Sequence, residues 1–280
     1  MRSVKLDNKQ KYITLRNNIA PQVSIRTIRR RLRERNMRKW LAAGRPKLTE
    51  EHARKRLEWA KRYKDFTPED WLKVAWSDES SVAKSRNLRN VWIFRAPGEQ
   101  YLRNNVVPRT MGNSVSLMVW GCFAGDVRGP FLIFDGIEGR VSGEYYLERM
   151  QEELPRFMEY IAERLDTDPI FMQDNAPVHT SGIVKRWLRE QDFEMMDWPP
   201  FSPDLNLIEN LWAIMKDDLR DQYPEIADMR GGPAAIKHRL AEVLPIIWTR
   251  ISLEVCRSLS KSMVDRVKDI IVMRGWYTRR

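Results

Sequence analysis

The order of strand-like and helical segments predicts an α/β fold with a mixed β-sheet and helical segments at both ends of the chain. Three observations lead there: short apolar runs bounded by turn residues, helical periodicity between several of them, and a change of composition near residue 65. The expected strands are 71–76, 91–94, 114–124, 131–134, 170–172 and 195–198, and the expected helices among them are 143–165, 181–190 and 207–219.

Charge is unevenly distributed along the 280 residues, whose formal net charge is +11. Residues 1–64 carry 21 Lys and Arg against 5 Asp and Glu, whereas the rest of the chain carries 28 against 33. A basic arm on a mildly acidic body indicates a polyanionic partner, since clustered Lys and Arg attract phosphates irrespective of sequence. A solvated cationic face is the alternative that charge alone leaves open.

The arm contains an expected helix over 23–36, with Ser24 as its N-cap. Ile25, Ile28 and Leu32 form one apolar stripe, and the opposite face is almost entirely arginine. With 13–19 as part of a partner helix, this segment would be the recognition helix of a helix-turn-helix. The expected DNA contacts are therefore on this face: Arg26, Arg29, Arg30 and Arg33. A solvated surface helix would show the same pattern.

A turn-prone basic segment, 44–47, follows and reads as a linker. Its Arg45 and Lys47 are further candidates for DNA contact, because such a stretch can lie in the minor groove. An ordinary linker is the alternative. Thr49 then caps an expected helix over 50–64, and we place a domain boundary near Asp65.

Two carboxylates, Asp78 and Asp174, follow apolar strand-like runs, and Glu209 lies in the first turn of an expected helix. If one sheet delivers the first two to the same edge and the helix faces it, the three can bind hard divalent cations such as Mg²⁺. Two such ions about 3.5–4 Å apart stabilise the attacking and leaving oxygens of a phosphodiester. His179, five residues after Asp174, is a candidate for positioning water or substrate.

Each of these residues also has a structural explanation. Asp78 would cap a turn, and Asp174 with its neighbour Asn175 would form an Asx-turn after a strand. With Asn206 as N-cap, Glu209 occupies the position of a capping-box glutamate. A lone histidine such as His179 is more often structural than catalytic.

The three regions together resemble, in order, the signatures of Tc1/mariner-type transposases. The matching segments are Trp76-Ser77-Asp78-Glu79-Ser80, Gln173-Asp174-Asn175-Ala176-Pro177-Val178-His179 and Ser202-Pro203-Asp204-Leu205-Asn206-Leu207-Ile208-Glu209-Asn210-Leu211-Trp212. The thirty-four residues between Asp174 and Glu209 match the Tc1-like branch, whose triad is Asp, Asp and Glu.

The resemblance implies an RNase H-like catalytic domain in which Asp78, Asp174 and Glu209 hold two Mg²⁺ or Mn²⁺ ions. It implies cleavage at terminal inverted repeats, attack of the freed 3′-hydroxyl on target DNA, and action as a homo-oligomer on double-stranded DNA in the nucleus. The expected division is 1–64, a partial helix-turn-helix region and linker; 65–225, the DDE endonuclease domain; and 226–280, a C-terminal helical extension.

The sequence also departs from the family pattern. There is room for only one of the two usual helix-turn-helix units, so the chain is expected to be shortened at its N-terminus, and Leu207 stands where proline is usual. Two alternatives stay open: a non-catalytic, transposase-derived DNA-binding protein, and another RNase H-like nuclease acting, for instance, on RNA–DNA hybrids.

Other functional classes find no support in the sequence. Cys122 and Cys256 lack zinc-type spacing and suggest no disulfide framework. No apolar run approaches the roughly 20 residues that cross a bilayer, and the N-terminus has no signal-peptide core. A soluble, intracellular protein without a membrane partner is expected.

Overall fold

The computed structural model describes residues 12–34, 48–84, 115–134 and 141–278. It divides into two compact units, Met1–Lys47 and Leu48–Arg280, each of which is described here by itself. The expected strand at 91–94 and the candidate residues Arg45 and Lys47 lie outside the described residues. The three-part division at 64/65 and 225/226 stays a prediction.

The first unit contains two contacting helices, α2 (Tyr12–Ile19) and α3 (Ile25–Arg33). Ser24 caps α3, and its Oγ accepts a hydrogen bond from the backbone N–H of Thr27 at 3.1 Å. The predicted helix and its cap are confirmed. The arginine face is exposed, as the apolar stripe on the other side requires.

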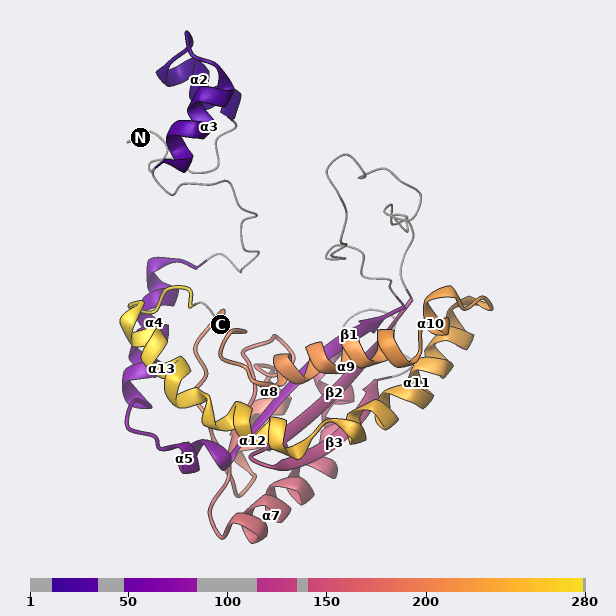
Figure 1. The fold of residues 1–280 in the computed structure, drawn as a ribbon. Coiled ribbons are helices and arrows are strands. Elements are labelled where there is room, and N and C mark those ends of the chain that lie inside the picture. The colour runs from indigo at the N-terminus through magenta and orange to yellow at the C-terminus, as the bar shows by residue number, and fades with distance from the viewer. Residues whose placement is uncertain (1–11, 35–47, 85–114, 135–140, 279–280) are drawn as a thin grey trace. The chain divides into compact units, whose positions relative to one another are not determined.

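The second unit is built on a five-stranded mixed sheet with the order β3-β2-β1-β4-β5. Strands β1, β2 and β3 of this sheet are labelled in Figure 1. The antiparallel part comprises β1 (Val74–Ala83), β2 (Ser116–Ala124) and β3 (Val127–Phe134). The parallel part adds β4 (Ile170–Met172) and β5 (Glu194–Met195) on the other side of β1. The predicted mixed sheet is confirmed, with β4 buried in its interior.

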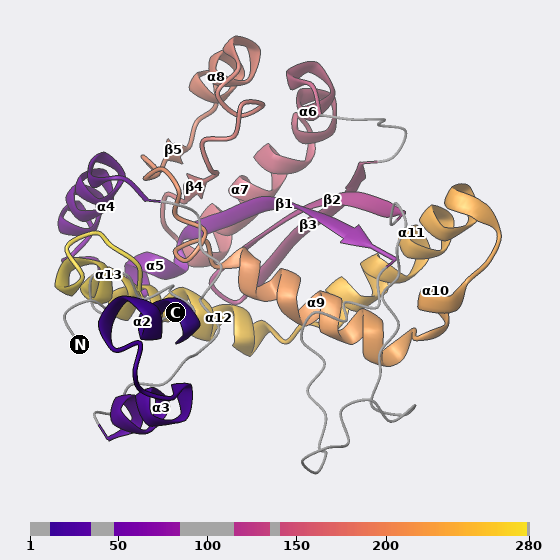
Figure 2. The ribbon, with the colours of Figure 1, turned by 90° about the horizontal axis from the view of Figure 1, so that it is seen from above.

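Helices cover both faces of this sheet, giving three layers (Figure 2). One face packs on α9 (Ile208–Gln222), α11 (Gly232–Arg250) and α12 (Leu253–Lys261). The other packs on α6 (Gly143–Met150), α7 (Glu153–Leu165) and α8 (Gly182–Arg189). Successive side chains of a strand alternate between the two layers, so Val74 and Trp76 lie in the first core and Ala75 in the second.

The expected strand at 71–76 is wrong in its bounds. Trp71 belongs to a short helix, α5 (Pro68–Leu72), because Thr67 caps it and Pro68 sets the backbone angle of its first turn. Strand β1 begins at Val74 and continues through polar residues to Ala83, because β2 pairs with it along Ala75–Ala83. Asp78 is therefore in the middle of a strand, and the alternative that it caps a turn is wrong.

The single helix expected over 143–165 is two helices separated at Gln151 and Glu152. Pro155 explains the break. It has no N–H for the carbonyl of Gln151 and its ring would clash with that carbonyl, so a helix cannot run through this point undisturbed. Within the expected C-terminal helical extension, α12 is likewise followed by a separate helix, α13 (Met263–Val272).

Helix α4 (Glu50–Arg62) carries a buried arginine that ties together three distant segments. Arg56, 1% exposed, donates to both carboxylate oxygens of Asp204, at 2.8 and 2.7 Å. It also donates to Ser202 Oγ at 2.7 Å and to the carbonyl of Gly275 at 2.9 Å. α4 and the C-terminal residues thus hold the loop that leads into α9.

The remaining described helix is α10 (Glu225–Asp228), which contacts α11. None of the described helices combines the length and the apolar character that crossing a lipid bilayer requires.

We expect Arg56→Ala to lower the free energy of unfolding by about 3–5 kcal/mol, because it leaves the Asp204 carboxylate buried without its partner. Chemical denaturation followed by circular dichroism measures this. The matched control is Arg62→Ala on the same helix, whose ion pair with Asp197 is solvent-exposed and should contribute little. Equal stability losses in the two variants would contradict the buried network.

Candidate active site

The parallel pairing of β1 with β4 places Asp174 beside Asp78. Val74 pairs with Ile170 and Trp76 with Met172, a constant offset of 96 residues. The same offset carried forward from Asp78 leads to Asp174, although β4 itself ends at Met172. Among the residues that the structure describes, no strand pairs with this side of β1 from Ser77 onward, so the two carboxylates lie at an open edge of the sheet. The expectation that Asp174 follows a strand is confirmed.

A glycine lets α9 approach this edge closely. Gly121 of β2 pairs with Asp78 across the antiparallel ladder, so both positions face the same helical layer. A Cβ at Gly121 would lie 2.8 Å from the Trp212 ring, so only glycine leaves room for that side chain. Trp212 is one helical turn beyond Glu209. Its packing on the sheet therefore brings Glu209 toward Asp78.

Asp78 is held by hydrogen bonds to both carboxylate oxygens. Oδ1 accepts from the backbone N–H of Glu79 at 2.8 Å, and Oδ2 accepts from Asn206 Nδ2 at 2.9 Å. Burial, and after it the negative charges of Glu79, Glu209 and Asp174, together raise the pKa of Asp78 to about 8. The three sequence-predicted carboxylates are thus within electrostatic range of one another.

Glu209 does not form the capping box that its position suggested. α9 begins one residue later than expected, with Leu207 at the N-cap position and no side-chain cap. The side-chain amide of Asn206 donates to Asp78 instead of capping the helix. The Glu209 carboxylate is therefore not engaged in a capping box with Asn206. Partial burial raises the pKa of Glu209; the charge of Lys216, two turns along α9, opposes this, and that of Asp174 adds to it.

Asp174 forms the expected Asx-turn, in which its Oδ1 accepts from the N–H of Ala176 at 2.8 Å. The same oxygen lies 2.8 Å from Nδ1 of His179, and the other ring nitrogen, Nε2, lies 3.1 Å from Oε1 of Glu79. Burial acts to raise the pKa of Asp174, but the hydrogen bonds from His179 and Ala176 outweigh it and hold the pKa below its usual value. Burial acts to lower the pKa of His179, but its two carboxylate partners outweigh it and raise the pKa to about 10.

The donor set suits a hard divalent cation, because it consists of carboxylate oxygens. Asn206 Oδ1 is in addition buried, and no described residue forms a hydrogen bond with it. Within the described part of the chain, however, no three His, Cys, Asp or Glu side chains are already gathered around one point. Mutual repulsion explains this, since Asp78 is bonded toward Asn206 and Asp174 toward His179. Metal binding would therefore require the carboxylate groups to move closer together.

Three residues near the carboxylates were not singled out as functional from the sequence. Glu79 follows Asp78 directly, and strand alternation, once β1 is known, places it on the opposite face. Asn206 was assigned to helix capping. Lys216 is half-buried and falls seven residues after Glu209, a spacing that puts both on one face of a helix. Burial lowers the pKa of Lys216, against the charges of Glu209 and Asp78.

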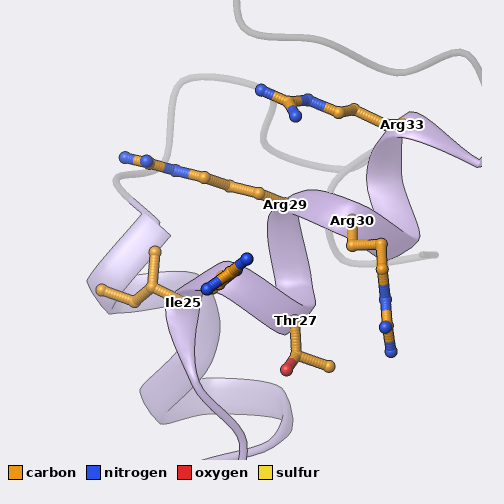
Figure 3. Close-up of a pocket in the computed structure, with 6 residues that line it drawn as sticks. Ile25, Thr27, Arg29, Arg30 and Arg33 are labelled. Atoms are coloured by element: carbon orange, nitrogen blue, oxygen red, sulfur yellow. The ribbon is translucent and has the colours of Figure 1, made fainter.

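The arginine face of α3 lines a hollow in the first unit (Figure 3). Arg29 and Arg33 extend to one side of the helix, whereas Arg30 points away from them (Figure 3). Arg26, Arg29, Arg30 and Arg33 are all exposed, which agrees both with DNA contact and with a solvated surface helix. The neighbouring Arg31 is directed to Glu34, to which it donates at 3.0 Å.

Two family models match the chain. One, described as a DDE superfamily endonuclease, matches residues 73–230 and therefore spans the sheet and all three carboxylates. The other, described as a transposase and of the Tc3-type helix-turn-helix class, matches residues 2–65.

Curated relatives agree with these models. The transposase of the transposable element Tcb1 from Caenorhabditis briggsae is 31% identical over 92% of this chain and 89% of its own length. The Tc1 transposase of Caenorhabditis elegans is 29% identical over the same shares.

Solved structures show the same fold. The strand transfer complex of Mos1 transposase aligns with a TM-score of 0.74 over 99% of this chain and 77% of that one, at 19% identity. The catalytic domain of Mos1 mariner transposase aligns with a TM-score of 0.58 over 85% of this chain and 100% of that one, at 18% identity. The sheet topology, the endonuclease and helix-turn-helix models and the curated relatives agree: the chain belongs to the Tc1-type DNA transposases, DDE enzymes with an RNase H-like catalytic fold and a helix-turn-helix DNA-binding segment.

Proposed function

We propose that Asp78, Asp174 and Glu209 bind two Mg²⁺ or Mn²⁺ ions and that this site cleaves double-stranded DNA at transposon ends and joins it to target DNA. The observation that carries the proposal is the arrangement of three carboxylates at one open sheet edge, where the charges of Glu209 and Asp174 add to burial and to Glu79 in raising the pKa of Asp78 to about 8. Structures of Mos1 transposase with Mg and with Mn support the choice of ion.

Each of these residues has a distinct part in the proposed site. Asp78 is fixed in the rigid central strand, Asp174 follows the neighbouring strand, and Glu209 comes from the helix that packs over them. Divalent ions, when bound, would stabilise the attacking and leaving oxygens of the phosphodiester. The ammonium of Lys216, on the Glu209 side, adds positive charge where a phosphate would approach.

DNA contact in this proposal comes from Arg26, Arg29, Arg30 and Arg33 of α3, and from Arg45 and Lys47 in the basic linker. A Mos1 transposase structure is a paired-end complex with a transposon end, which supports transposon-end DNA as the partner and action as a homo-oligomer. Since transposon ends and target DNA are the proposed substrates, the proposed location is the nucleus.

An active enzyme is favoured over a transposase-derived protein that only binds DNA. Placing like charges together beside a sheet is unfavourable, and DNA binding alone gains nothing from acidic groups near a phosphate. The helix-turn-helix segment equally favours a transposase over a nuclease acting on RNA–DNA hybrids.

The direct test is Asp174→Ala, assayed for Mn²⁺-dependent nicking of DNA that carries the terminal repeats. We expect the nicking rate to fall by more than about 100-fold. Even the loss of a residue that only hydrogen-bonds to a metal ligand lowers metal affinity or activity about 10–100-fold. DNA affinity should be unchanged. Asp221→Ala, an exposed acid on α9, is the matched control. If Asp174→Ala nicks DNA as fast as the parent protein, the assignment is wrong.

Asp78→Asn should stabilise the protein in EDTA while abolishing cleavage. The pKa of Asp78 is about 8 in the fold and about 4 in an unfolded chain. Between these values the folded state binds the extra proton, so this group lowers stability progressively as pH rises. At pH 8 the melting temperature of the variant should exceed that of the parent, by about 2–4 °C for each kcal/mol of destabilisation that the substitution removes. The difference should shrink toward pH 4.

Scanning calorimetry at several pH values measures this difference. Asn206 can rotate its amide to offer Oδ1 to the new side chain, so the substitution keeps a hydrogen bond at that position. A difference that does not change with pH, or a less stable variant, would contradict the electrostatic account of Asp78.

For α3, we expect Arg29→Ala with Arg33→Ala to weaken binding to double-stranded DNA and to reduce its salt dependence. Each lost phosphate contact should lower the slope of log affinity against log salt by about 0.9. Fluorescence anisotropy at several salt concentrations measures both effects. The control is Arg31→Ala, which lies off the stripe of the other arginines and pairs with Glu34. If the control loses as much slope, α3 does not bind DNA through this face.

A further inference from the structure

A series of three charged side chains, linked by short contacts, lies next to the proposed metal site. Glu79 Oε1 lies 3.1 Å from His179 Nε2, and His179 Nδ1 lies 2.8 Å from Asp174 Oδ1. The His179 side chain is only 2% exposed and that of Glu79 16%, whereas that of Asp174 is 44% exposed. The linked side chains therefore extend from Glu79 and His179 in the protein interior to Asp174 at the open sheet edge.

Both nitrogens of the His179 ring face carboxylate oxygens, so both act as donors and the ring is a cation. The Tyr146 ring lies against it, with centroids 5.1 Å apart, and Tyr146 donates to Gln173 Oε1 at 3.3 Å. The ring is thus fixed on both edges and on one face. Because the His179 ring is held in place, it can fix the orientation of the Asp174 carboxylate.

His179 contacts the Oδ1 oxygen of Asp174, and this oxygen also accepts a hydrogen bond from the N–H of Ala176. Among the residues that the structure describes, no hydrogen bond reaches Oδ2. Fixing one oxygen sets the direction of the other. The ring cation would repel a divalent ion if it stood alone, and the Glu79 carboxylate balances its charge.

We propose that Glu79 and His179 are positioning residues that hold the Asp174 carboxylate by Oδ1 and present Oδ2 to the divalent cation, with Glu79 cancelling the charge of the ring. The proposal rests on the function proposed above, in which Asp174 is a metal ligand. It assigns a task to Glu79, which faces away from Asp78 although it is next to it in the chain.

A purely structural pair would differ in one measurable way. If Glu79 and His179 only attach the loop after β4 to β1, their loss lowers stability and leaves the metal affinity of the folded protein unchanged. If they position Asp174, metal affinity changes, because partners of metal ligands contribute about 10–100-fold to it. Metal affinity is therefore the decisive quantity.

The experiment titrates Mn²⁺ alone into the full-length protein by calorimetry and compares two double variants. Both carry Glu79→Gln; one adds His179→Asn and the other His179→Ala. The two have the same charge, and only asparagine retains an N–H donor near the position of the imidazole Nδ1. We expect the alanine variant to bind Mn²⁺ at least about tenfold more weakly than the asparagine variant.

Glu79→Gln alone should also bind Mn²⁺ more weakly than the parent, and more weakly than the variant that combines it with His179→Asn, because it leaves the ring charge uncompensated. The matched control is His238→Ala, which removes an exposed histidine 3.2 Å from Glu242 and should leave the affinity unchanged. Circular dichroism confirms folding; if the alanine variant does not fold, the order of the other three proteins decides.

Equal Mn²⁺ affinities in the two double variants, with a lower melting temperature for alanine, would overturn the positioning role. Asp174→Ala in the same titration separates this outcome from failure of the proposed function. If Asp174→Ala binds Mn²⁺ as the parent does, the metal site itself is wrong. If it loses binding while the double variants remain equal, only the role of Glu79 and His179 is wrong.

Discussion

Repulsion between carboxylates at one sheet edge is the constraint on which the rest of the catalytic unit depends. Asp78 lies in β1, Asp174 follows the adjacent strand β4, and Glu209 approaches them from α9. Their proximity shows in the pKa of Asp78, which burial and three neighbouring negative charges raise to about 8. A fold that holds such groups together has to stabilise them from outside.

The surrounding structure does so with donors and with rigidity. Asn206 and the Glu79 N–H satisfy Asp78, and His179 with the Ala176 N–H satisfies Asp174. Behind them, the Arg56–Asp204 pair anchors the loop that carries Asn206. Arg266 of α13 donates to the carbonyl of Asp204 and to Asn210, so the C-terminal helices hold the same loop. The placement of Glu209 therefore depends on residues at both ends of the second unit.

Many features of the fold and the candidate site could be predicted from local sequence patterns. The others depend on strand pairing and on contacts between residues far apart in the sequence. Ser24 as a cap, the strand 170–172 and the Asx-turn at Asp174 are local features, and the structure has them all. The extent of β1 was not local, because only its ladder with β2 makes a strand of five consecutive polar residues. The same ladder determines which face of the sheet Glu79 occupies. Its contact with His179 could therefore not be predicted from the sequence. Asn206 was assigned to helix capping because asparagine before a helix is usually an N-cap. In the structure its side-chain amide donates instead to the distant carboxylate of Asp78.

The central claim is that the three carboxylates form a metal site, and Mn²⁺ soaked into crystals of the protein, located by anomalous diffraction, tests it most directly. The account predicts anomalous density between Asp78, Asp174 and Glu209, with Asp174 contributing Oδ2 while His179 keeps Oδ1. Density elsewhere, or Asp78 and Glu209 left without Mn²⁺ at saturating concentration, would contradict it.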